Sequence, residues 1–295
     1  MSRIQDILSK AERDGNTRRT RGLSDEGLMS PPVTIGSRPQ QPAYESGASH
    51  PWTPAATATA IEPEQTVTTS TLDPCLVAAL APQSLAAEQY RSLRTRIKQA
   101  ENGRAVRAIV ITSPNKGDGK SLTAANLALT MAQEFQQRVL LIDADLRRPA
   151  VHNLFGMPAG PGLADVLMGA LELSQALIKV EHHHLTLLPA GSVPHHPAEL
   201  LGSAAMRRVL DSLRARYDRI LIDMPPVAPL ADLHIVAPMA DGLLMIVRAG
   251  VTPRPAIERA LSGLDMSKVL GLVLNESGGN IADTTAYHDY GYVGG

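Results

Sequence analysis

Residues 113–121 read SPNKGDGKS, and no other stretch of the chain is as informative. This stretch lies between an apolar run, VRAIVIT at 106–112, and a helix-forming run at 121–135. Gly117 and Gly119 allow backbone amides to curl around an anion, and the N-terminus of the following helix adds partial positive charge. A strand, a glycine-rich turn closing on Gly-Lys-Ser and a helix together predict a phosphate-binding loop.

The loop departs from the general pattern at one position, because Pro114 stands where the leading Gly is expected. Lys120 is predicted to neutralise charge on the β- and γ-phosphates of ATP, and the Ser121 hydroxyl to bind Mg²⁺. The predicted nucleotide-binding residues are Asn115, Lys116, Gly117, Asp118, Gly119, Lys120, Ser121 and Leu122.

Two further motifs place carboxylates at the ends of apolar runs. VLLIDADLRRP at 139–149 contains Asp143 and Asp145, and ILIDMPP at 220–226 contains Asp223. Ligands of open α/β folds bind at the carboxyl edge of the sheet, so these side chains are expected beside the loop. Carboxylates and a serine hydroxyl suit Mg²⁺, and the predicted metal ligands are Ser121, Asp143 and Asp223.

The alternation of apolar runs and helical stretches predicts an α/β fold with a doubly wound, mostly parallel sheet. Nearly continuous apolar strands are what a sheet buried on both faces requires. The expected strands are 106–112, 138–143, 219–223, 242–247 and 269–274, and the expected helices are 84–100, 121–135, 203–216 and 254–265.

Outside this region the composition changes. Residues 1–15 predict a short amphipathic helix, and 16–75, rich in Pro, Thr, Ser, Gly and Ala, predict a disordered linker. The ATP-binding domain is expected over 76–275, followed by a flexible, tyrosine-containing tail over 276–295.

The bulk composition excludes several classes of protein. One cysteine excludes an internal disulfide framework, and a net charge of −1 gives no reason to expect nucleic acid as a partner. The sequence shows neither a signal-peptide core nor a run of about 18 apolar residues, so a cytoplasmic location is expected.

The three motifs SPNKGDGKS, LLIDADLRRP and ILIDMPP resemble the Walker A, A′ and B motifs of bacterial protein-tyrosine kinases. The resemblance covers roughly residues 80–292. The MinD/ParA-like partition and septum-placement ATPases share this P-loop NTPase fold, but their loop carries a signature Lys directly before a Gly-Gly pair. Here Lys116 precedes only Gly117, and Asp118 follows, which favours the kinases.

The resemblance implies an ATP-dependent autokinase that phosphorylates tyrosines of its own C-terminal tail in a neighbouring subunit. The candidate acceptors are Tyr287, Tyr290 and Tyr292. Asp145 is the candidate base or orienting acceptor for the tyrosine hydroxyl, although Asp143 could exchange roles with it.

Two more positions complete the predicted site. Arg147 is expected to stabilise the acceptor tail or the phosphates, and Asn275 resembles an adenine-contacting position. A turn residue at the strand end is an alternative interpretation of Asn275.

The resemblance also implies partners. Glu88, Arg91 and Arg94 match the E-x-x-R-x-x-R helix that forms subunit contacts in the kinase rings, so a homo-oligomer is expected. A separate transmembrane activator or polysaccharide chain-length protein would recruit the chain to the inner face of the membrane. The implied pathway is exopolysaccharide biosynthesis and export.

Two other functions fit the same residues. One is a MinD/ParA-like ATPase switch that transfers phosphate to water and positions cargo on a membrane or nucleoid. The other is a regulatory scaffold that binds ATP without efficient transfer. Mapping phosphate from labelled ATP separates all three.

Overall fold

The computed structural model describes residues 63, 65–68, 72–134, 136–227 and 232–276. The predicted N-terminal helix at 1–15, most of the predicted linker and the three tail tyrosines lie outside the described residues.

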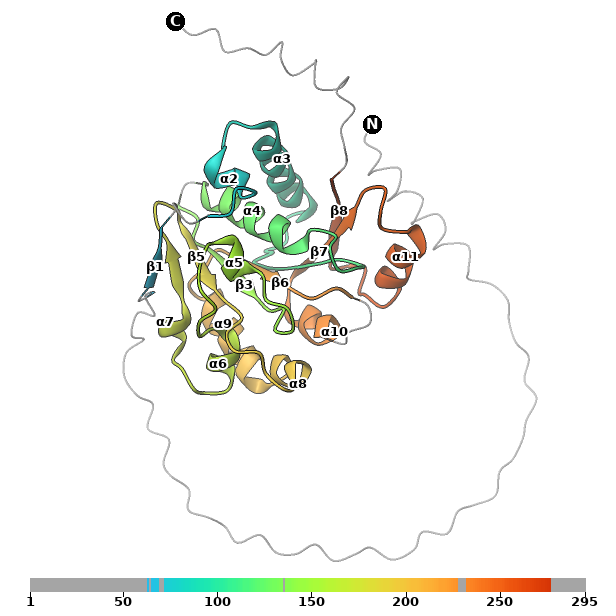
Figure 1. Ribbon diagram of the computed structural model, residues 1–295. Helices are drawn as coiled ribbons and strands as arrows, with labels where there is room; N and C mark the ends of the chain where they lie inside the picture. Colours follow the sequence, from blue (N-terminus) through green and yellow to red (C-terminus); the bar gives the residue numbers. More distant parts are fainter. Residues whose placement is uncertain (1–62, 64, 69–71, 135, 228–231, 277–295) are drawn as a thin grey trace, which may run out of the picture. The chain divides into compact units, whose positions relative to one another are not determined.

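The described region is built on one eight-stranded sheet (Figure 1). Its spatial order is β1-β4-β5-β3-β6-β2-β7-β8. Every neighbouring pair is parallel except β4 and β5, so the predicted mostly parallel, doubly wound sheet is confirmed. The strands are β1 Gln65–Val67, β2 Ala108–Thr112, β3 Val139–Asp143, β4 Ile178–Val180, β5 Leu185–Leu188, β6 Arg219–Asp223, β7 Gly242–Arg248 and β8 Val269–Asn275.

Helices cover both faces of the sheet (Figure 1). Along β2, Ala108 and Val110 pack into one apolar cluster, whereas Ile109 and Ile111 pack into the other. This alternation follows from the two-residue period of a strand, and it explains why the run is apolar at every position. The helices are α2 Val77–Leu80, α3 Leu85–Ala100, α4 Lys120–Ala132, α5 Val151–Leu154, α6 Leu163–Leu167, α7 Leu173–Ala176, α8 Pro197–Leu201, α9 Ala204–Arg214, α10 Asp232–Val236, the 3₁₀ helix η2 Ala237–Met239 and α11 Arg254–Ser262.

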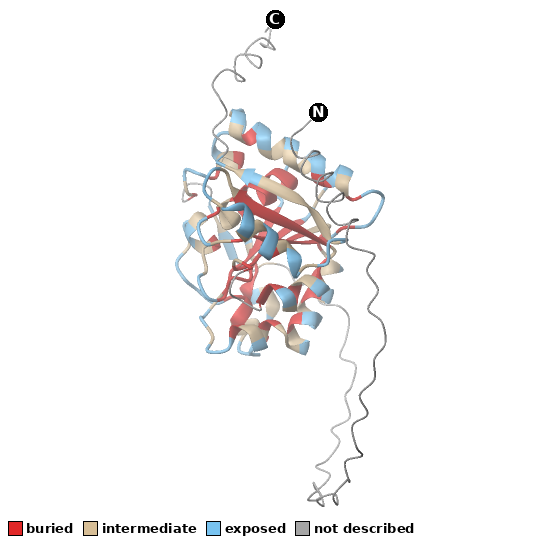
Figure 2. Ribbon diagram, turned by 90° about the vertical axis from the view of Figure 1, so that its right-hand side faces the viewer, coloured by how far each residue is buried: buried red, intermediate tan, exposed pale blue. Residues whose placement is uncertain are grey.

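The two faces carry different sets of helices. α2, α4 and α5 contribute to one cluster with Ile97 of α3, whereas α6, α9, α10 and α11 contribute to the other. Figure 2 shows the buried strands between helices whose outer surfaces are exposed. Ser84 caps α3, because its hydroxyl accepts a hydrogen bond from the Ala87 amide.

The structure corrects the predicted boundary of the folded domain. Residues 65–67 lie in the predicted disordered linker, but they form β1, which pairs with β4 over Gln65–Ile178, Thr66–Lys179 and Val67–Val180. Leu72, also before the predicted start at 76, is buried. A three-residue strand has too few positions for a period to appear, and its pairing with β4 is a long-range contact.

Candidate functional site

The phosphate-binding loop joins β2 to α4. Gly117 has φ 86° and Gly119 has φ 90°, values that side chains other than glycine rarely adopt. Gly119 is the N-cap of α4 and has no side chain to accept from the first amides of that helix. Those amides and the helix dipole therefore face the loop without an internal partner, which is the arrangement that binds phosphate.

The strand-end carboxylates meet beside this loop because β3 and β6 are neighbours. Asp143 and Asp223 are partners in the register of the two strands. The Lys120 ammonium lies 2.9 Å from Asp145 Oδ2 and 3.6 Å from Asp223 Oδ1, and it donates to Ser121 Oγ at 3.1 Å. Burial acts to lower the pKa of Lys120, but Asp223 and Asp145 outweigh it and raise that pKa, so the ammonium stays charged.

Asp223 differs from its neighbours in its hydrogen bonding, because the polar groups closest to its charge are the Lys120 ammonium at 3.6 Å and the Ser121 hydroxyl. It is fully buried, and neither carboxylate oxygen accepts a hydrogen bond of normal length and angle from a described residue. Burial raises its pKa to about 7, against the lowering effect of the Lys120 charge. A buried carboxylate without donors is costly unless a cation or its bound water completes the site. The Ser121 hydroxyl and the Asp223 carboxylate are therefore a donor set that fits Mg²⁺.

Asp143 is engaged by the backbone. Its Oδ1 accepts from the Asp145 amide at 3.1 Å, and its Oδ2 accepts from the amides of Ala150 and Val151 at 3.0 Å each. These bonds shape the turn from β3 into α5. Burial nevertheless raises the pKa of Asp143 to about 6.

Asp145 divides its carboxylate between two partners. Its Oδ1 accepts from the Arg148 amide at 3.0 Å, while its Oδ2 forms the ion pair with Lys120. The side chain is 5% exposed and reaches the cavity beside the loop. Of the two aspartates in the DAD sequence, Asp145 is thus the one that a substrate can meet.

A cavity of about 710 Å³ opens beside the loop. Its lining includes many of the predicted residues: Lys116, Gly117, Gly119, Lys120, Ser121, Leu122, Asp145 and Arg147. The residues that the sequence analysis did not assign to the site are Arg148, Ala150, Asn153, Leu154, Pro225 and Pro226. Pro225, Pro226 and Arg148 belong to the quoted motifs, so their membership in those motifs was the sequence signal that could have assigned them to the site.

The two arginines of the A′ motif have different environments. Arg147 forms a bidentate ion pair with Asp232 at the start of α10, with Nε–Oδ2 at 2.7 Å and Nη2–Oδ1 at 3.0 Å. Asp232 is buried, and Arg147 is 38% exposed. No side-chain hydrogen bond or ion pair joins Arg148 to another described residue, although its amide donates to Asp145. Arg148 is therefore the arginine whose guanidinium is available in this cavity.

Asp118 and Asn275 hold the loop in place. Asp118 is 2% exposed, and its carbonyl oxygen accepts from Asn275 Nδ2 at 3.0 Å. The amide of Asn275 also lies against Gly119, where a Cβ atom would be only 2.0 Å from it. The predicted adenine contact of Asn275 stays a prediction, but its side chain already has this contact within the protein.

The predicted interface residues also have partners within the chain. Arg91 pairs with Glu88 at 2.7 Å, while Arg94 pairs with Glu134 at 3.2 Å and donates to the Thr130 carbonyl at 2.7 Å. Arg94 thus joins α3 to the end of α4. The subunit-contact role of these residues stays a prediction.

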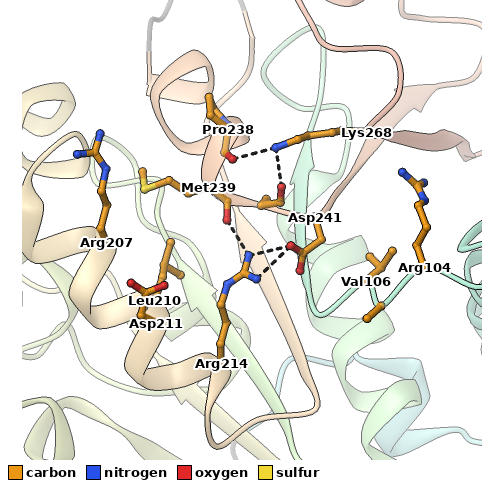
Figure 3. Close-up of a pocket in the computed structure, with 12 residues that line it drawn as sticks. Arg104, Val106, Arg207, Leu210, Asp211, Arg214, Pro238, Met239, Asp241 and Lys268 are labelled. Carbon is orange, nitrogen blue, oxygen red and sulfur yellow. Dashed lines mark hydrogen bonds and ion pairs between the residues drawn. The ribbon is translucent and has the colours of Figure 1, made fainter.

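A second cavity, of about 540 Å³, lies at the opposite edge of the sheet, near the amino ends of β2, β7 and β8 (Figure 3). Arg214 donates to Asp241 and to the Met239 carbonyl, and Lys268 donates to the carbonyls of Pro238 and Ala240. These bonds fasten η2 to the sheet. The Arg214, Asp241 and Lys268 charges at the centre of this cavity are therefore engaged within the fold.

Fold and site together define a doubly wound P-loop NTPase domain. A family model described as an AAA domain matches residues 106–255. The tyrosine-protein kinase YwqD of Bacillus subtilis is 38% identical over 221 residues, which cover 74% of this chain and 91% of that protein. The chain therefore belongs to the family of bacterial tyrosine-protein kinases.

Other relatives agree with this assignment. The tyrosine-protein kinase wzc of Salmonella typhimurium is 35% identical over 74% of this chain, but the match spans only 30% of that longer protein. The kinase domain of the Escherichia coli tyrosine kinase ETK has a TM-score of 0.64 and 30% identity, covering 70% of this chain and 80% of that one. In the described part of the chain, no helix is long and apolar enough to cross a membrane.

Proposed function

We propose that this protein is an ATP-dependent protein-tyrosine autokinase that phosphorylates Tyr287, Tyr290 and Tyr292 of a neighbouring copy. The observation that carries the proposal is the arrangement beside the loop. Lys120 lies between Asp145 and Asp223, and the buried Asp223 carboxylate accepts no hydrogen bond of normal geometry from a described residue. This arrangement occurs in a chain whose relatives are named tyrosine kinases.

Each part of the site has a role in the proposal. The loop amides from Lys116 to Leu122 and the Lys120 ammonium bind the phosphates of ATP and stabilise the charge that develops during transfer. Ser121 and Asp223 hold Mg²⁺, with Asp143 beside them. The metal ion would neutralise phosphate charge when bound.

The transfer itself forms one bond and breaks one. The tyrosine oxygen attacks the γ-phosphorus, the bond from that phosphorus to the β–γ bridging oxygen breaks, and ADP leaves. Asp145, which reaches the cavity, orients the tyrosine hydroxyl and accepts its proton. Arg148 supplies the positive charge that the acceptor tail or the transferred phosphate meets, while Arg147 holds the turn through Asp232.

The family suggests the biological setting. The succinoglycan biosynthesis transport protein ExoP of Rhizobium meliloti is 35% identical over 67% of this chain. We propose that this protein regulates exopolysaccharide biosynthesis and export. Its copies assemble in a ring through Glu88, Arg91 and Arg94. A separate transmembrane activator recruits it to the inner face of the membrane.

Labelled ATP tests the proposed reaction. The purified chain is incubated with Mg²⁺ and γ-labelled ATP, with and without the cytosolic segment of a candidate activator, and phosphate is mapped. Label is expected on the tail tyrosines, lost in the Tyr287→Phe/Tyr290→Phe/Tyr292→Phe triple variant and in Lys120→Met, and kept in the Tyr44→Phe control. Rapid phosphate release without tyrosine label would instead identify an ATPase switch.

A mixing experiment tests transfer between copies. The Lys120→Met chain keeps its tyrosines but cannot transfer phosphate, and the triple tyrosine variant has an intact loop but no tail acceptor. If transfer occurs between copies, the mixture labels the Lys120→Met chain. A mixture that stays unlabelled, while the wild-type chain is labelled, would show that each copy phosphorylates only itself.

A further inference from the structure

The phosphate-binding loop contains a carboxylate, Asp118, which would repel the phosphates if it faced them. The structure holds it elsewhere. Asp118 is 2% exposed and is absent from the lining of the cavity beside the loop. Its Oδ2 accepts from the Asn115 amide at 2.9 Å, and its Oδ1 accepts from the Thr252 hydroxyl at 2.8 Å.

Thr252 has its hydrogen-bonding direction fixed by its own turn. It lies between β7 and α11, 134 residues from Asp118 in the sequence. Its Oγ1 accepts from the Arg248 amide at 3.0 Å, and the Thr252 amide donates back to the Arg248 carbonyl at 3.0 Å. The hydroxyl oxygen thus accepts one hydrogen bond from the Arg248 amide, while its single hydrogen is donated to the Asp118 carboxylate. A hydrogen bond to an ionised acceptor is among the stronger ones in proteins.

We propose that Thr252 is a positioning residue for nucleotide binding, which acts by holding the Asp118 carboxylate away from the phosphates. The inference rests on the proposed binding of ATP by this loop. Without the Thr252 hydroxyl, Asp118 loses its side-chain donor, and the Asn115 backbone amide alone holds the carboxylate less firmly. Its carboxylate can then turn toward the loop interior, where its charge opposes the phosphates. Thr252 touches neither ATP nor the acceptor and therefore affects binding through Asp118.

Two substitutions separate this role from packing. Thr252→Val keeps the shape but removes the hydroxyl, and it should raise both the Kd and the KM for ATP by about tenfold, the usual effect of losing one hydrogen bond to a charged group. The kcat for tail labelling should stay within about twofold, because the reacting groups are untouched. Thr252→Ser keeps the hydroxyl and should restore the wild-type KM. Ser262→Ala is the matched control, since that hydroxyl on α11 bonds only to the Arg259 carbonyl.

A double-mutant cycle identifies the intermediate residue. In an Asp118→Ala background, Thr252→Val should change the Kd for ATP by less than about twofold, because no carboxylate remains to be released. Hydrogen exchange on the nucleotide-free chain gives a second measurement. The Asn115 amide should exchange faster in Thr252→Val than in wild type.

The outcomes distinguish this inference from the proposed function. If wild type binds ATP and Thr252→Val binds it equally well, the positioning role is overturned and the kinase proposal stands. If Thr252→Val weakens binding just as much in the Asp118→Ala background, Thr252 does not act through Asp118, which also overturns the inference. If wild type itself binds no ATP in the presence of Mg²⁺, both proposals fail.

Discussion

Replacing Asp223 by Asn should make the nucleotide-free protein more stable at alkaline pH. Burial holds the pKa of Asp223 at about 7, against an ordinary value of 3.8. The native state therefore keeps a proton that the unfolded chain has already lost, so the contribution of Asp223 to stability is fully present below pH 3.8 and is lost as pH rises through 7. Between pH 5 and pH 8, at about 1.36 kcal/mol per pH unit up to the folded-state pKa, the loss is about 3 kcal/mol. An asparagine side chain at this position does not titrate in this pH range, so the variant does not show this loss of stability.

Urea unfolding followed by circular dichroism, with EDTA and without nucleotide, measures this effect. The free energy of unfolding of Asp223→Asn, relative to wild type, should rise by about 3 kcal/mol from pH 5 to pH 8. At pH 8 the free energy of unfolding of the variant should exceed that of wild type by less than about 3 kcal/mol. The side-chain amide of the variant still needs hydrogen-bond partners, and Lys120 loses a carboxylate at 3.6 Å. Parallel stability curves for the two proteins across this range would refute the reasoning.

A matched control is available in Asp218. Its hydrogen bond and charge pairing with Arg138 lower its pKa, so it is ionised in both native and unfolded states from pH 5 to pH 8. Asp218→Asn should therefore change stability by the same amount at both pH values. Adding Mg²⁺ and ATP should reduce the advantage of Asp223→Asn, because wild type then has a cation beside this carboxylate.

Three further substitutions test the backbone and the arginines. Gly119→Ala should lower the free energy of unfolding by more than ~1–2 kcal/mol, because the new Cβ adds a clash with the Asn275 side chain to the strain of a left-handed backbone. Gly169→Ala is the control, because Gly169 has φ +74° but nothing within 4 Å, so that only the backbone strain remains. Equal losses of stability for the two variants in urea unfolding would contradict the clash. Arg147→Ala should cost about 2–3 kcal/mol by leaving Asp232 buried and unpaired. Arg148→Ala should change stability by less than ~0.5 kcal/mol yet reduce tail labelling about tenfold, whereas the reverse pattern would exchange the roles of the two arginines.

The central sheet could be predicted because its strands are buried on both faces. β3 and β6 read VLLID and RILID, and each ends in an aspartate at the carboxyl edge. A strand with two buried faces leaves a continuous apolar run in the sequence. The same regularity predicted Asp143 and Asp223 at the carboxyl edge beside the loop, and the structure pairs them in the register of neighbouring strands.

Other features depend on contacts with no local signal. β1 and β4 have three residues each, too few for a periodic pattern. The pairing of Arg147 with Asp232 spans 85 residues, so the sequence could not show which arginine was already engaged. The different roles of Asp143 and Asp145 depend on the backbone amides that donate to each carboxylate. Which amides those are is set by the path of the turn after β3, and the motif itself does not show it.

The pairing of β1 with β4 determines where the chain can be shortened. A fragment starting at Leu76 would keep the complete nucleotide motifs but would lose β1 and the buried Leu72. Its β4 would then present unpaired amides and carbonyls along one side, and such an exposed edge recruits strands of other molecules. A fragment intended for crystallisation or assay should therefore begin upstream of Gln65, since a cut at the start of the recognisable motifs favours aggregation.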